Sequence, residues 1–68
     1  MSGADVAGMA NQIATYFAAY PRDEAVAGIA DHIMKFWNPD MRRDLLAVAA
    51  SKPATLHELV ASALPKLA

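Results

Sequence analysis

Apolar residues recur every three or four positions along most of the chain, a spacing that places them on one face of a helix. The first such segment runs from about Asp5 to Tyr20, and its large apolar residues fall within roughly 120° of one another at 100° per residue. We expect this face to point inward together with Ala10: Val6, Met9, Ile13, Tyr16, Phe17 and Tyr20. Pro21 is expected to end the segment, because the residue before a proline is pushed out of the helical region.

A second segment with helical spacing runs from about Asp23 to Trp37. On its polar side, Asp31 and Lys35 are four residues apart, in the order that favours an ion pair. The apolar side is predicted to face the core: Val26, Ile29, Ala30, Ile33, Phe36 and Trp37.

Two shorter helices are predicted after the second segment. Asn38 is suited to cap a helix and Pro39 to occupy its first position, so a third helix is expected over about residues 39–50. Its inward positions are Met41, Leu45 and Val48. After a loop, Thr55 and Glu58 have the spacing of a capping box for a fourth helix over about residues 55–64. The apolar face of that helix holds Leu56, Leu59, Val60 and Ala63, and Pro65 is expected to end or bend it.

These patterns predict an all-α fold: a small bundle of three to four short helices in one domain over residues 1–68. Hydrophobic residues make up 56% of the chain, which excludes a disordered tail. A chain this short buries only about 60% of the surface that its unfolded form exposes. Domains of this size usually rely on a disulfide, a metal or a partner protein for stability. The chain has no cysteine, which excludes disulfides, thiolate zinc sites and cysteine-ligated iron–sulfur clusters. A partner protein is therefore the expected source of stability.

The net charge of −1 argues against nucleic acid as a partner, because a basic face is the first requirement for binding it. There is also no basic stripe for an anionic membrane. The longest uncharged run, Val6 to Tyr20, is too short and too polar to span a bilayer. The first residues lack the features of a signal peptide, and we expect a cytoplasmic protein.

No catalytic, cofactor-binding or metal-ligating residue is expected in this chain. The three glycines lie far apart, so they form no phosphate-binding loop, and no nucleophile has a recognisable setting. His32 and His57 stand beside acidic residues. They are open to two interpretations, a metal or acid–base role or ordinary surface histidines.

The polar side of the first segment is the first candidate partner surface. It is small and uncharged, whereas a solvent-facing stripe normally carries charges. Its members are Gly8, Asn11, Gln12, Thr15, Ala18 and Ala19. The alternatives are a weak surface helix or burial of both faces within the same domain. Gly28, on the polar stripe of the second segment, indicates either a close contact with another backbone or a tolerated accident.

A second candidate surface is the corner between the second and third helices, which joins aromatic, thioether and guanidinium groups of the types enriched at interfaces. We assign to it Trp37, Asn38, Pro39, Met41 and Arg42, with His32 and an outward Leu46 nearby. In the alternative interpretation, Phe36 and Trp37 fill the core of the domain and the arginines are solvated. Phe36 is expected to face inward in either case.

The same residues resemble a known family, the delta subunit of NAD-dependent, molybdenum-containing formate dehydrogenases. The resemblance rests on four stretches: Met9-Ala10-Asn11-Gln12-Ile13, Gly28-Ile29-Ala30-Asp31-His32-Ile33, Phe36-Trp37-Asn38-Pro39-Asp40-Met41-Arg42 and Leu45-Leu46. Phe17, Pro21 and the leucine-rich segment from Leu56 to Leu64 are similar too.

The resemblance implies a place in a cytoplasmic complex that oxidises formate to carbon dioxide and reduces NAD to NADH. In that family the alpha subunit holds a bis-molybdopterin guanine dinucleotide cofactor and iron–sulfur clusters. The beta and gamma subunits carry FMN and further clusters. We therefore expect a non-catalytic accessory subunit that stabilises the alpha subunit or assists its assembly. The alternatives are a transient chaperone for cofactor insertion and a generic helical regulator.

Overall fold

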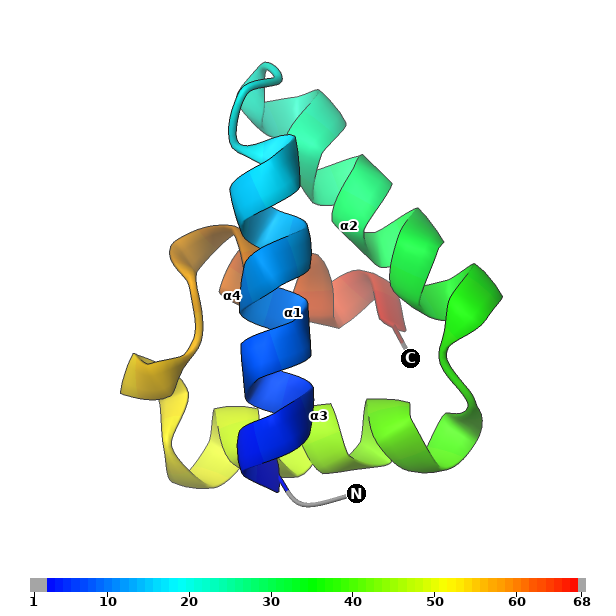
Figure 1. The fold of residues 1–68 in the computed structure, drawn as a ribbon, viewed down its shortest axis with the longest axis vertical. Helices are drawn as coiled ribbons and strands as arrows, with labels where there is room; N and C mark the ends of the chain where they lie inside the picture. The colour runs from blue at the N-terminus through cyan, green and yellow to red at the C-terminus, as the bar shows by residue number, and fades with distance from the viewer. Residues whose placement is uncertain (1–2, 68) are drawn as a thin grey trace.

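The computed structural model describes residues 3–67, and within them every element is helical. The elements are α1 (Gly3–Phe17), α2 (Arg22–Phe36), α3 (Pro39–Ser51), the 3-10 turn η1 (Pro53–Thr55), α4 (Glu58–Ala63) and the 3-10 turn η2 (Leu64–Leu67). As Figure 1 shows, α1 and α2 meet at one end and diverge, α3 runs across their open end, and α4 crosses behind them. The predicted all-α bundle of short helices is confirmed.

Local signals place most of the helix ends within a few residues of their predicted positions. The side chain of Asn38 accepts a hydrogen bond from the Met41 N–H at 2.9 Å, and Pro39 is the first residue of α3, as predicted. The first helix ends at Phe17 rather than Tyr20, because a turn closed by the Tyr20 N–H on the Phe17 carbonyl precedes Pro21. Pro21 then occupies the N-cap position of α2.

The predicted capping box at Thr55 is wrong. Thr55 belongs to η1, and its hydroxyl donates to the Lys52 carbonyl at 2.8 Å, so it does not reach the next helix. His57 is the cap instead: its Nδ1 accepts from the Leu59 N–H at 3.0 Å. As a result α4 has only six residues, and η2 begins at Leu64, just before Pro65.

The core lies where the four helices meet. Its largest fully buried side chains are Val6, Ile29, Ile33, Leu45 and Val60. Apart from Val6, the fully buried residues of α1 are the small Ala10 and Ala14, whereas Tyr16 is 66% exposed. The prediction that Tyr16 and Tyr20 point inward is therefore wrong. Alanine lets neighbouring helices approach closely, and the bulky side chains of α1 lie at the edge of the contact.

The two aromatics at the end of α2 were both predicted on its apolar side, and this is confirmed for Trp37 but wrong for Phe36. Trp37 is only 6% exposed and belongs to the core, whereas Phe36 is 72% exposed. The helix ends at Phe36, and the backbone at Trp37 is extended (φ −95°, ψ 140°). Because the 100° step per residue no longer applies at Trp37, its side chain turns into the core while Phe36 stays on the outside of the helix.

Exposed ion pairs join neighbouring turns or helices at three places in residues 3–67, one of them between Arg43 and Asp40 in α3 at 2.9 Å. The predicted pair of Lys35 with Asp31 is present at 3.1 Å. Arg22, at the start of α2, donates to Glu58 at 2.8 Å and to the Ser62 hydroxyl at 2.7 Å in α4. The hydrogen bond from Arg22 lowers the pKa of Glu58. Both groups are well solvated, so this link contributes little to the stability of the fold.

Candidate partner interface

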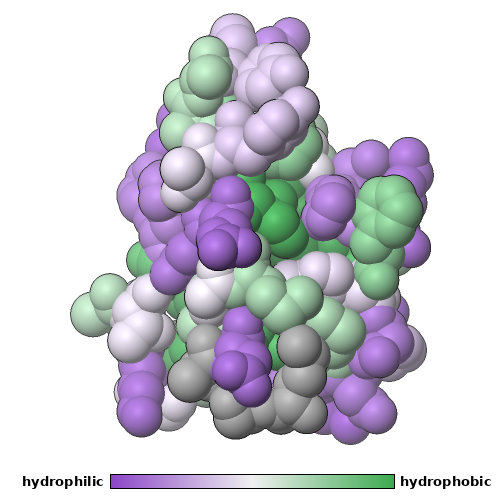
Figure 2. Space-filling view, in the orientation of Figure 1, coloured by the Kyte–Doolittle hydropathy of each residue, from purple (hydrophilic) through white to green (hydrophobic). Residues whose placement is uncertain are grey.

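An apolar groove lies between α1 and α2, on the face where the two helices diverge. It has a volume of about 570 Å³, and we call it the aromatic groove. Its lining consists of Met9, Gln12, Ile13, Tyr16, Phe17 and His32. Figure 2 shows strongly hydrophobic surface in the hollow of this face, bordered by polar side chains. Exposed apolar surface of this kind, rimmed by polar groups, is typical of a protein-binding site.

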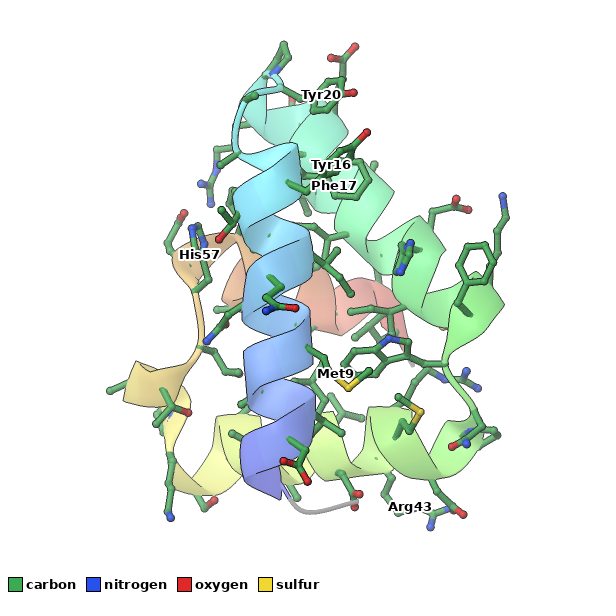
Figure 3. The ribbon with its side chains drawn as sticks, viewed as in Figure 1. Met9, Tyr16, Phe17, Tyr20, Arg43 and His57 are labelled. Carbon is green, nitrogen blue, oxygen red and sulfur yellow. The ribbon has the colours of Figure 1, made fainter. Side chains whose placement is uncertain are left out.

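Three aromatic rings gather at the end of the groove where α1 and α2 meet (Figure 3). The ring centroid of Tyr16 lies 5.1 Å from that of Phe17, with the rings edge to face, and 6.2 Å from that of Tyr20. A hydrogen bond with Tyr16 raises the pKa of the Tyr20 hydroxyl, and the charge of Glu24 adds to this effect. The cluster therefore presents large ring surfaces together with hydroxyl groups, as tyrosine-rich interfaces do.

The α2 side of the groove carries a second aromatic contact. The His32 ring, half-buried, lies 4.8 Å from the ring of Phe36, one helical turn further on. Phe36 extends into solvent beside the groove. Of the residues assigned to a partner surface from sequence, Gln12 and His32 lie in this groove, and their role there stays a prediction.

The bulky side chains of α1 line the groove because of an adjacent stripe of small residues. Ala10 and Ala14 fill the core positions, so the neighbouring positions Met9 and Ile13 are only half-buried. The sequence analysis placed Met9, Ala10 and Ile13 on one inward face, did not include Ala14, and missed the groove. The signal was present: Ala10 and Ala14 lie four residues apart, and alanine is the residue that a close helix contact selects.

Gly28 packs against the ring of Phe17, which leaves no room for a side chain at position 28. A Cβ atom at this position would lie 2.5 Å from Cε1 of Phe17 and 2.9 Å from two more of its ring atoms. The close contact predicted at Gly28 therefore exists, but its partner is the Phe17 ring rather than a second protein. Since Phe17 also lines the groove, Gly28 helps to set the shape of that surface.

Replacing Gly28 with alanine is expected to destabilise the isolated chain by about 1 kcal/mol. Alanine gains about 1 kcal/mol of helix propensity, but moving the packed Phe17 ring costs about 1–3 kcal/mol. Urea unfolding followed by circular dichroism measures the difference. Gly8→Ala is the matched control, because nothing lies within 4 Å of a Cβ there, and it should stabilise. Equal stabilisation by both changes would contradict the packing role of Gly28.

The polar side of α1 is partly used within the chain. The Asn11 side-chain amide donates to the Thr55 carbonyl at 2.8 Å and accepts from the His57 N–H at 2.8 Å. Thr15 donates back to the Asn11 carbonyl. The polar face of α1 was expected to contact a partner, to form the surface of a weak helix or to be buried within the domain. For Asn11 the contacts lie within the domain. A second hollow of about 590 Å³, which includes Gly8 and Asn11, lies between α1 and α3.

Most residues of the corner between α2 and α3 make their contacts within the chain. The Trp37 side chain is in the core, which contradicts its assignment to a partner surface, and Arg42 donates to the Trp37 carbonyl at 2.5 Å. Asn38 is used as a cap, and Met41 packs against the core. Pro39 and Leu46 are exposed, although neither lines the aromatic groove.

Across the described residues, no group of three or more histidine, aspartate or glutamate side chains is placed to hold a metal ion. No helix in this part of the chain has the length and apolar character needed to cross a membrane.

Comparison with known proteins gives one match. The sequence model of the family described as NADH-dependent formate dehydrogenase delta subunit FdsD matches residues 6–64. The searches of curated proteins and of solved structures gave no match. The matched range contains α2, α3, α4 and nearly all of α1, and with them the whole lining of the aromatic groove.

Proposed function

We propose, since the chain belongs to the delta-subunit family of NADH-dependent formate dehydrogenases, that it is a non-catalytic accessory subunit of such a complex. The aromatic groove is the observation that supports this role. Residues that a lone domain would bury, Ile13 and Tyr16 among them, border solvent here. Covering them on a larger subunit would remove apolar surface from water and so stabilise both proteins.

The proposed partner is the alpha subunit of the complex. In the expected division of labour, that subunit holds the bis-molybdopterin guanine dinucleotide cofactor and iron–sulfur clusters, and the beta and gamma subunits carry FMN and further clusters. We assign none of these groups to this chain. Its contribution is to hold a surface of the alpha subunit in one conformation and shield it from water, because binding to the folded state stabilises that state.

The test is to purify the complex from cells that contain or lack this chain. Without it we expect a lower yield of assembled complex and a lower formate:NAD activity per cell, both restored when the chain is expressed again. One copy per alpha subunit in the mature enzyme is expected for a structural subunit. A substoichiometric amount would instead show a transient assembly chaperone. Unchanged yield and activity would refute an accessory role of either kind.

A further inference from the structure

We infer that the aromatic groove receives an amphipathic helix of the partner subunit, with large apolar residues on one stripe and a lysine or arginine facing Glu24. The inference rests on the proposed function and adds the chemistry of the contact to it. Three features of the groove carry it: the spacing of its side chains, the shape set by two diverging helices, and the distribution of charge around it.

The spacing of the groove residues favours a helix as the occupant. On α1, Met9, Ile13 and Tyr16 follow one another at intervals of four and three residues, which is the spacing of a coiled-coil seam. Such a seam is complementary to a second helix, because each side chain inserts between residues of the facing helix. Among the residues that the structure describes, the seam of α1 has no complete partner, since Met9 and Ile13 are half-buried and Tyr16 is largely exposed.

The groove also has two helical sides, which is the shape that receives a third helix. Its α2 side presents His32, with Phe36 one turn further along the same side. From Met9 to Phe17, α1 offers roughly 12 Å of contact at 1.5 Å per residue, a little over two turns of an occupying helix. An amphipathic helix laid in an apolar groove is a common mode of peptide recognition, with anchors at positions i, i+3 or i+4, and i+7.

The charges beside the groove specify the polar edge of the occupant. No charged residue lies between Asp5 and Arg22 in the sequence, so the edge facing α1 meets only uncharged groups. On α2, Asp31 is already paired with Lys35. Glu24 lies in the first turn of α2, at the end where α1 and α2 meet and four residues after Tyr20 of the aromatic cluster, and it forms no ion pair with any residue of the range 3–67. A basic residue of the partner fits that position.

Photo-cross-linking in the purified complex tests this assignment. A benzophenone amino acid replaces Tyr16, which is exposed enough to tolerate it, and a second version carries the same group at Leu46, an exposed position of α3 outside the groove. The expected cross-link from position 16 maps to one helical segment of a partner subunit. In that segment, apolar residues recur every three or four positions, and a lysine or arginine flanks them.

Four results would overturn the inference: a cross-link from position 16 to a second copy of this chain, to a non-helical segment, to a helical segment without the basic residue, or to nothing while position 46 reacts.

The second measurement is the affinity of variants of this chain for a formate dehydrogenase complex that was prepared without it. Tyr16→Glu places a charge in the seam and is expected to weaken binding about tenfold or more, whereas Ala50→Glu, at an exposed position of α3 outside both hollows, is expected to leave it unchanged. Circular dichroism verifies that both variants fold. Glu24→Lys should also weaken binding, and reversing the charge of the cross-linked basic residue should restore it. Wild-type binding by Tyr16→Glu would refute the groove as the contact. If omission of the whole chain still impaired the complex, the proposed function would stand.

Discussion

Replacing Trp37 with alanine is expected to remove a large part of the free energy of unfolding of the isolated chain. The side chain lies in the core with Ile33 and Leu45, and removing a buried tryptophan costs about 3–5 kcal/mol through lost apolar contact and the cavity left behind. A chain of 68 residues has a free energy of unfolding of roughly 3–10 kcal/mol. The change therefore removes a large part of the total. Urea or thermal unfolding followed by circular dichroism measures the loss.

The matched control is Phe36→Ala, one residue earlier. Because Phe36 is mostly in solvent, with its ring centroid 4.8 Å from that of His32, this change should alter the stability of the isolated chain by less than about 0.5 kcal/mol. The helical pattern alone predicts similar losses for the two changes. A larger loss from Phe36→Ala than from Trp37→Ala would contradict the extended backbone at Trp37 and the core built on it.

Replacing Asn11 with alanine is expected to destabilise the chain by about 2 kcal/mol. The side chain makes two hydrogen bonds to backbone groups 44 and 46 residues away, each contributing about 0.5–1.5 kcal/mol. The partner at His57 is half-buried, so its N–H would be left without an acceptor. Since His57 also caps α4, the loss should reach that helix. Urea unfolding gives the total, and hydrogen exchange at the His57 and Leu59 amides localises it.

Gln12→Ala is the control for Asn11, because Gln12 is the neighbouring amide and is exposed beside the groove. Its replacement should leave the stability of the isolated chain within about 0.5 kcal/mol of the wild type. Equal and small losses from the two changes would show that Asn11 does not hold the segment before α4 against α1.

The helical class of the chain and the approximate extent of each long helix could be predicted from the amino-acid pattern. These features depend on interactions within a few residues. The periodic apolar positions, the Asn38 cap followed by Pro39, and the break before Pro21 act locally, and the structure has each of them. The family resemblance was visible in the sequence for a similar reason, because a motif is a linear pattern.

Which apolar side chains are buried, and which are left exposed, depends on how the helices pack against one another. Trp37 replaces Phe36 in the core because the chain leaves the helix between them, and Ala14 is buried while Tyr16 is exposed because helix crossings select small residues. The bonds of Asn11 and the contact of Phe17 with Gly28 join residues far apart in the sequence. Such contacts depend on the distances and angles between helices, which the period of a single helix does not specify.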